Sequence, residues 1–271
     1  MPSKNTLSDQ DLLKSVMNNP KYKEIIPSLV ERIVKDETLK NKSNSEIVKS
    51  TRSLLHQIGG AYLNSKIDYA KWLDQFRLFP PDMKDANVQH TLKVMMQLHA
   101  SSKERLPILD TFYKTIFADL PPISSILDLA CGLNPLSIPW MLLSDDFTYI
   151  ACDIYTDMLD FHNSLFKHFN IKGKAYGCDL TKLDSLPQVQ MTFILKTLPC
   201  LEQLNKQISF SLLQAIRSEY VLVSFPVKSL SGREKGMHNT YSRHFKELLT
   251  DSSWKVRSFE FSSELAFLLF H

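Results

Sequence analysis

The first part of the chain carries the pattern of amphipathic helices. Apolar residues recur three and four positions apart almost throughout residues 8–106, and no stretch there alternates with the period of two that marks a strand. Ser8 is a suitable N-cap for a first helix, and Pro27 opens a second. A third helix begins at residue 44 or 45, and the glycine pair at 59–60 breaks or kinks it. The pattern predicts an all-helical region.

The second part alternates short apolar runs with helical stretches. The runs are rich in Ile, Val and Phe, and their lengths suit buried strands joined by crossover helices. They cover residues 125–130, 149–152, 174–178, 191–196, 220–225, 255–261 and 265–270. Only three residues separate the last two runs, so these two should form an antiparallel hairpin. The pattern predicts an α/β fold, with a mostly parallel, doubly wound sheet of seven strands and helices on both faces.

Length and charge agree with a division into two parts. A chain of 271 residues suits one large or two modest domains, and we expect a helical domain over residues 1–107 and an α/β domain over residues 108–271. The net charge of +3 is uneven, because residues 1–107 hold 17 Lys and Arg against 12 Asp and Glu, and the rest hold 15 against 17. A basic module beside a slightly acidic one is typical of docking onto a polyanion, although +5 also occurs on ordinary surfaces.

Several classes of protein are excluded or disfavoured. No apolar stretch approaches the roughly 18–20 residues that cross a bilayer, and residues 1–17 hold acids and amides where a signal peptide needs an apolar segment. We therefore expect a cytoplasmic protein without a membrane span. The cysteines include no CxxC pair, so we expect no metal site and thiols that are reduced and mostly buried. They are Cys131, Cys152, Cys178 and Cys200.

The most informative segment is ILDLACGLNP at residues 126–135, an apolar strand that ends in a turn of small residues before a helix. At such a strand end a ligand approaches the backbone closely, and Gly132 removes side-chain obstruction. Asn134 tolerates the positive φ for which glycine is otherwise used. A dinucleotide site would need three glycines in G-x-G-x-x-G, whereas this turn has one. S-adenosylmethionine, which has no pyrophosphate, is favoured over NAD, and a turn without a ligand remains the alternative.

Two acids follow the next two predicted strands. Asp153 comes directly after the run at 149–152, and Asp179 comes after the run at 174–178. An acid after the second strand can accept hydrogen bonds from both ribose hydroxyls, and one after the third can approach the adenine amino group. Each alone could equally be a helix N-cap. Three such strand ends in one sheet together indicate a cofactor pocket.

Five segments, in order along about 180 residues, resemble the aminoglycoside-resistance 16S rRNA methyltransferases that modify N7 of guanine 1405. They are LHQIGGAY at 55–62, HASSKERL at 99–106, DLACGLNP at 128–135, KTLP at 196–199 and SFPVKSLSGREKGM at 224–237. The last is long enough to be highly specific, whereas the third alone fits many methyltransferases. The resemblance implies a Rossmann-like, seven-stranded class I methyltransferase domain with S-adenosylmethionine as cofactor. It implies that the helical domain of a monomer docks on 16S rRNA in the assembled 30S subunit.

The resemblance also implies residue roles. Arg105 lies at a position where the family holds the methionine carboxylate of the cofactor, and a guanidinium offers a bidentate fork for it. Taken alone, Arg105 would be interpreted as a surface arginine, and His56 as either a core histidine or a phosphate contact. The other implied cofactor positions are Asp128, Ala130, Gly132, Asn134, Asp153, Asp179 and Leu198. The implied rRNA contacts are Lys21, Arg52, His56, Lys228 and Arg233.

The implied reaction needs positioning rather than acid–base catalysis. Guanine N7 carries a lone pair and no proton, so the base must be flipped out and aligned with the methyl carbon. Lys196, Arg233 and Met237 lie at family positions near the target nucleotide. The chain departs from the family pattern at Gln203 and at residues 238–240, HNT, where two acids and an asparagine are usual.

Two other functions remain open from the sequence. A small-molecule or protein methyltransferase with a helical lid is the main alternative, because a cofactor pocket does not define a substrate. A cofactor-binding protein without catalysis is the third hypothesis. It is disfavoured because the pocket acids and the segment at 224–237 are intact.

Overall fold

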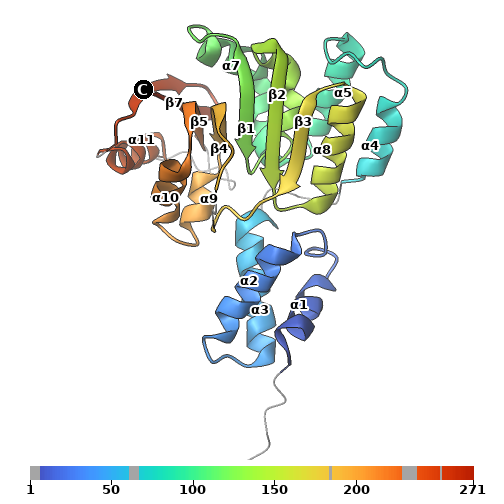
Figure 1. Cartoon of the computed structure of the whole chain (residues 1–271), viewed down its shortest axis with the longest axis vertical. Coiled ribbons are helices and arrows are strands. Elements are labelled where there is room, and N and C mark those ends of the chain that lie inside the picture. Colours follow the sequence, from blue (N-terminus) through green and yellow to red (C-terminus); the bar gives the residue numbers. More distant parts are fainter. Residues whose placement is uncertain (1–6, 61–66, 183–184, 228–236, 251) are drawn as a thin grey trace, which may run out of the picture.

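A computed structural model of the chain describes residues 7–60, 67–182, 185–227, 237–250 and 252–271, and only the backbone of residues 60 and 237–239. Figure 1 shows three N-terminal helices as a lobe that projects from a larger body built around one sheet. No helix in these described ranges is long and apolar enough to cross a membrane.

The lobe consists of helices that begin at the residues the sequence indicates. They are α1 (Asp9–Met17), α2 (Pro27–Thr38) and α3 (Asn44–Leu55). The Ser8 side chain caps α1 by accepting from the backbone amide of Asp11 at 3.2 Å, and Pro27 is the first residue of α2. Ser43 and Glu46 form a capping box at α3. The lobe has an apolar core of its own, made of aliphatic side chains and Tyr22.

The helices after the lobe belong to the body. A π-helical turn, η1 (His56–Gly60), ends α3 where the glycine pair predicts a break. There follow α4 (Tyr69–Phe76), α5 (Ala86–Met96), α6 (Ala100–Arg105), η2 (Leu106–Ile108) and α7 (Leu109–Phe117). Trp72 and Leu92 share one core with the sheet, whereas Leu55 belongs to the core of the lobe. Helical periodicity does not show which core a helix joins.

The body contains one seven-stranded sheet. Its strands are β1 (Ile123–Leu129), β2 (Leu143–Asp153), β3 (Lys172–Gly177), β4 (Val189–Leu195), β5 (Ser218–Pro226), β6 (Lys255–Glu260) and β7 (Glu264–Phe270). Their order is β3-β2-β1-β4-β5-β7-β6. β7 is antiparallel to both neighbours and the other pairs are parallel, which confirms the predicted hairpin and the single reversed strand.

Helices cover both faces of the sheet, as predicted. Alternate residues of β1 face opposite ways, with Ile126 in the core formed with α4, α5, α7 and α8 (Thr156–His168). Leu127 faces the core formed with α9 (Leu198–Glu202), α10 (Ile208–Ala215) and α11 (Met237–Leu248). The helix predicted after β1 is instead a 3-10 helix, η3 (Asn134–Trp140). Its two prolines lack the amide hydrogens that a regular α-helix would need.

Candidate functional site

A pocket opens at the carboxyl ends of the parallel strands, beside β1, where the strand order reverses. This is the position at which open α/β sheets bind ligands. Gly132, Asp153 and Asp179 line it from the turns after β1, β2 and β3, and Lys196 lines it from the end of β4. The empty space in the pocket amounts to about 750 Å³, which includes the part that is open to solvent.

The turn after β1 is held from several sides. Ala130 and Gly132 have positive φ angles of 52° and 50°. Asn134 has a negative φ, so the positive φ for which its residue type is suited does not occur there. The Gly132 amide donates to Asp153 Oδ2 at 2.9 Å, and its carbonyl accepts from His162 Nε2 at 2.7 Å. A Cβ on Gly132 would lie 2.7 Å from Cε1 of His99, so only glycine fits this turn.

Asp153 anchors the second turn and faces the pocket. Its Oδ1 accepts from the backbone amide of Ile154 at 2.6 Å, while Oδ2 accepts from Gly132. The residue is 9% exposed, and burial raises the pKa of this carboxyl above its usual value despite these hydrogen bonds. The position suits an acceptor for ligand hydroxyls.

Asp179 is held by a residue that the sequence did not indicate. Arg32 of α2 donates from Nε to Asp179 Oδ2 at 2.7 Å. Thr181 donates to Oδ1 from its amide at 2.9 Å and from its hydroxyl at 2.5 Å. Asp179 is therefore fixed partly by the lobe.

His99 and Lys196 complete the pocket wall. Lys196 has a positive φ of 60°, and its Nζ donates to the Ser101 carbonyl at 3.1 Å and to Glu104 Oε2 at 2.9 Å. Burial, together with the nearby cations Lys196 and Arg105, lowers the pKa of His99 to about 4. The imidazole is therefore neutral at physiological pH. Only the resemblance segment at 99–106 pointed to this histidine.

Arg105 lies in a buried network rather than on the pocket wall. Its Nε and Nη2 donate to the two carboxylate oxygens of Glu264 at 3.0 and 2.7 Å, and Nη1 donates to Asn134 Oδ1 at 2.8 Å. Lys196 Nζ is 3.3 Å from the same Glu264. Burial alone would raise the pKa of Glu264, but Arg105 and Lys196 hold it below its usual value. The Glu264 carboxylate on β7 is thus shared by two buried cations, of which Lys196 also pairs with Glu104.

The same network continues to Asp128. Asn134 donates from Nδ2 to Asp128 Oδ2 at 2.9 Å, and the Tyr149 hydroxyl donates to the same oxygen at 2.6 Å. Asp128 is 1% exposed, and burial raises its pKa to about 7 against these hydrogen bonds. Asp128 and Asn134 therefore support the β1 turn from the interior of the body.

The predicted site residues fall into three groups. Those on the pocket wall are Ala130, Gly132, Asp153, Asp179 and Lys196. Those in the interior are Arg105, Asp128, Asn134 and Leu198. Lys228, Arg233 and the side chain of Met237 lie outside the described residues.

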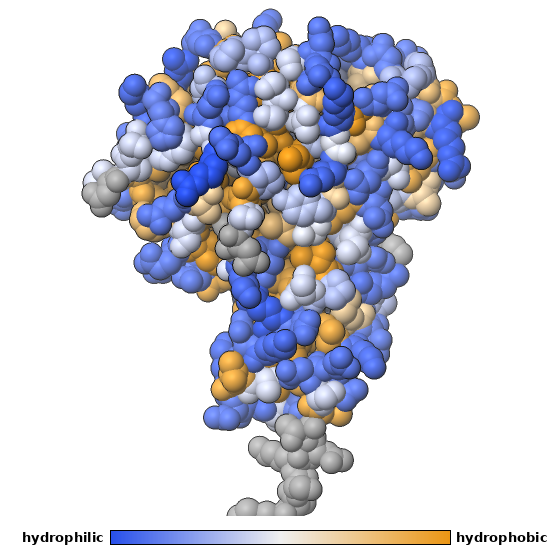
Figure 2. All heavy atoms as spheres, viewed as in Figure 1, coloured by the Kyte–Doolittle hydropathy of each residue, from blue (hydrophilic) through white to orange (hydrophobic). Residues whose placement is uncertain are grey.

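The predicted rRNA contacts in the lobe are accessible to different degrees. Lys21 and His56 are exposed, so His56 is not a core histidine. Arg52 is half-buried and donates from Nη2 to the Ser15 carbonyl at 2.6 Å. Figure 2 shows that hydrophilic residues cover most of the visible face of the lobe.

Comparison with known proteins identifies the family of the chain. A sequence model of the family described as "Ribosomal RNA methyltransferase (FmrO)" matches residues 18–268. The chain belongs to this family. A member from Micromonospora rosea is 32% identical over 260 residues, 95% of each chain. Another, from Micromonospora echinospora, is 33% identical over 259 residues, 94% of each chain. Both are named 16S rRNA (guanine(1405)-N(7))-methyltransferase.

Solved structures agree with this assignment. The 16S rRNA methyltransferase RmtF, in complex with S-adenosyl-L-homocysteine, superposes with a TM-score of 0.81 and 26% identity, covering 100% of this chain and 99% of its own. The 16S rRNA methylase RmtB gives a TM-score of 0.78 and 27% identity, covering 97% and 98%. The sheet of this family member is therefore that of a class I methyltransferase.

The pocket of this FmrO family member fits S-adenosylmethionine. Asp153 and Asp179 present carboxylate acceptors on the pocket wall, which is the chemistry that ribose hydroxyls and an adenine amino group need. Ile154, Leu180 and Leu201 provide apolar walls for a flat base. Gly132 keeps the turn open to close approach of a ligand.

Proposed function

We propose that this chain transfers the methyl group of S-adenosylmethionine to N7 of guanine 1405 in 16S rRNA of the assembled 30S subunit, acting as a monomer. Such a modification confers aminoglycoside resistance, because it places positive charge where cationic drugs bind. The observation that carries the proposal is a strand-end pocket with Asp153, Asp179 and Gly132 on its wall, in a chain that the FmrO family matches from residue 18 to 268.

The pocket residues divide the cofactor between them. Asp153 would accept from the ribose hydroxyls, Asp179 would accept from the adenine amino group, and the Ala130–Gly132 turn would contact the sulfur-containing chain. Arg105, which lies behind the pocket wall, is proposed to meet the methionine carboxylate with the N–H groups that the described residues leave unused, two of the five on a guanidinium. The cofactor supplies an electrophilic methyl group on a sulfonium.

The protein needs no general base for this transfer. The N7 lone pair forms the new bond to carbon as the bond from carbon to sulfur breaks, and the positive charge passes from sulfur to the guanine ring. No proton moves, so the residues around the reacting atoms act by alignment. Lys196 contributes a cation at this edge of the pocket, where the Ser101 carbonyl and Glu104 hold its Nζ in place. Arg233 and Met237 are proposed to hold the flipped nucleotide from the segment after β5.

The lobe is proposed to dock on the 30S subunit through Lys21, Arg52 and His56, with Lys228 and Arg233 adding contacts from the body. Folded rRNA is recognised largely through phosphates and sugars, and polar side chains on a small helical lobe suit that mode. Assembled subunits, rather than free RNA, present the fixed phosphate positions that such a surface can match.

Methyl transfer to purified 30S subunits, with free 16S rRNA alongside, tests this function. Borohydride and aniline cleavage then maps any 7-methylguanine. We expect cleavage at guanine 1405 in 30S subunits and none in free rRNA, and Asp153→Ala should abolish it. Labelled methyl that enters small molecules or proteins and leaves 30S subunits unlabelled would support the methyltransferase with a helical lid instead.

A further inference from the structure

The lobe contacts both acidic turns of the proposed cofactor pocket. The connection between α1 and α2 pairs with the turn that follows Asp153, because the Ile26 amide donates to the Ile154 carbonyl at 2.8 Å and the Thr156 amide donates to the Glu24 carbonyl at 2.7 Å. The ribose side of the pocket is thus tied to the lobe through its backbone.

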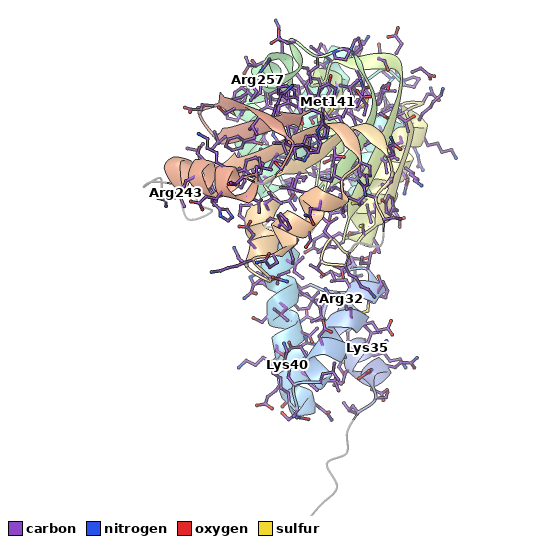
Figure 3. All side chains as sticks on the ribbon, turned by 60° about the vertical axis from the view of Figure 1, so that its left-hand side comes forward. Arg32, Lys35, Lys40, Met141, Arg243 and Arg257 are labelled. Atoms are coloured by element: carbon purple, nitrogen blue, oxygen red, sulfur yellow. The ribbon has the colours of Figure 1, made fainter. Side chains whose placement is uncertain are left out.

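A side chain ties the lobe to the second turn. The guanidinium of Arg32 donates from Nε to Asp179 at 2.7 Å, from Nη2 to the Thr181 hydroxyl at 2.5 Å and from Nη1 to Asp36 at 3.0 Å. Figure 3 shows Arg32 on the part of α2 nearer the sheet, whereas Lys35 and Lys40 lie farther along the lobe. The side chains of Arg32 and Asp179 are 28% and 15% exposed. A charge-assisted hydrogen bond joins this partly desolvated pair.

The two turns and the lobe are also in close contact. A Cβ on Gly177, at the end of β3, would lie only 2.4 Å from Cγ2 of Ile26, so glycine is needed for this approach. Leu29 of α2 lines the pocket directly. A displacement of the lobe would therefore change the pocket wall and release Asp179.

Asp179 has acceptor capacity left for a ligand. A carboxylate accepts about four hydrogen bonds, and Arg32 and Thr181 supply three from among the described residues. The remaining lone pair is on Oδ2, the oxygen that Arg32 orients. The direction in which Asp179 faces thus depends on a residue of the lobe.

We propose that Arg32 is a positioning residue for the cofactor: it orients Asp179 and thereby couples the placement of the α1–α3 lobe to occupation of the pocket. This inference rests on the proposed use of the pocket for S-adenosylmethionine. Coupling of this kind is reciprocal, so cofactor binding also favours the lobe placement that the rRNA meets. The lobe is then part of the cofactor site as well as a docking module.

Calorimetric binding of S-adenosylhomocysteine to the full chain tests the coupling. We expect Arg32→Met to weaken binding about tenfold, because Asp179 is then no longer oriented to make its charge-assisted hydrogen bond to the ligand. Arg32→Lys, which keeps the charge and loses the fork, should fall between Arg32→Met and the wild type. Asp36→Ala is the matched control, because it removes only the outer partner of Arg32 and should leave affinity within about twofold.

A double-variant cycle separates positioning from a general effect on the fold. If Arg32 acts through Asp179, Arg32→Met combined with Asp179→Asn should bind no more weakly than Asp179→Asn alone. Losses that multiply, or an Arg32→Met variant that binds like the wild type, would overturn the proposal. A wild-type chain that does not bind S-adenosylhomocysteine would overturn the proposed cofactor site itself, which is a different result.

Amide hydrogen exchange on the wild-type chain adds a test that needs no variant. We expect S-adenosylhomocysteine to slow exchange of the Ile26 amide and of α2, because the ligand selects the docked lobe. Slowing confined to the body would show that the lobe and the pocket are independent.

Discussion

The lobe and the pocket end of the sheet use charge in opposite ways. The lobe packs aliphatic side chains inside and leaves Lys21 and His56 in solvent, where phosphates of a large RNA can reach them. The pocket end buries Arg105, Lys196 and Glu264 together, each at most 3% exposed. Exposed charge gives contact and salt-sensitive affinity, whereas buried charge fixes the geometry of a turn. Under the proposed function, the first region would meet the rRNA and the second would hold the cofactor in place.

Among the described residues of the lobe, one charged side chain is buried. Glu37 is 2% exposed and pairs with Lys40 and Lys42 near the tip of the lobe. Burial would raise the pKa of Glu37, but the two lysines lower it to about 2. This carboxylate holds the connection between α2 and α3, at the end of the lobe farthest from the sheet (Figure 1).

The largest effect is expected from removing the acid in the buried network. Glu264→Ala leaves Arg105 and Lys196 without their shared counter-charge, and breaking a buried pair in this way costs about 3–5 kcal/mol. Urea unfolding should show a loss of that size. Asp74→Ala, which breaks an exposed pair with Arg77, should change the free energy of unfolding by less than about 1 kcal/mol. Equal losses in the two variants would show that the network is not a buried electrostatic unit.

A smaller effect is expected at the contact between the two regions. Gly177→Ala places a methyl group against the stiff, buried side chain of Ile26, and overpacking of this kind costs about 1–3 kcal/mol. Ile26→Ala in the same chain should recover part of the loss by making room. If the double variant is less stable than the two single changes predict together, the close approach is not the cause.

A pH effect follows from His162, which supports the β1 turn. Burial lowers its pKa to about 4 from 6.5, so the unfolded chain takes up a proton that the folded protein does not. The stability that this histidine contributes is present above pH 6.5 and is lost as the pH falls toward 4. Through this histidine, lowering the pH from 7 to 5 should reduce the free energy of unfolding by about 1–2 kcal/mol.

Unfolding of His162→Gln at the two pH values measures that share. The variant should lose less stability on acidification than the wild type. His90→Gln, at an exposed position, should keep the wild-type dependence. The interpretation fails if His162→Gln and the wild type have the same pH dependence.

The smallest effect on stability is expected on the lobe surface, although the effect on docking there is large. Lys21→Glu and His56→Glu should change the free energy of unfolding by no more than about 0.5 kcal/mol. Both should weaken 30S binding and reduce the slope of log affinity against log salt by about 0.7–0.9 for each phosphate that is no longer neutralised. Lys114→Glu on α7, at the opposite end of the molecule from the lobe (Figure 1), is the control. Equal weakening by all three would exclude the lobe as the specific docking surface.

Much of the fold follows from local patterns in the sequence. Ser8 and Pro27 mark helix starts because capping and proline geometry act within one turn. The apolar runs mark the strands, and the short link at residues 261–263 leaves only a hairpin. Asp153 and Asp179 were predicted as pocket residues because parallel strands end at one edge of a sheet, and both lie on the pocket wall.

Tertiary structure alone decided which distant side chains meet. Arg32 and Asp179 are 147 positions apart, and Arg105 and Glu264 are 159 apart. Periodicity shows which face of a helix or strand is buried, but it does not show which opposite charge is placed beside it. For the same reason the sequence does not show that Trp72 and Leu92 join the core of the sheet, whereas Leu55 joins the core of the lobe. Burial patterns are local properties of the chain, and the pairing of buried charges depends on how the whole chain packs.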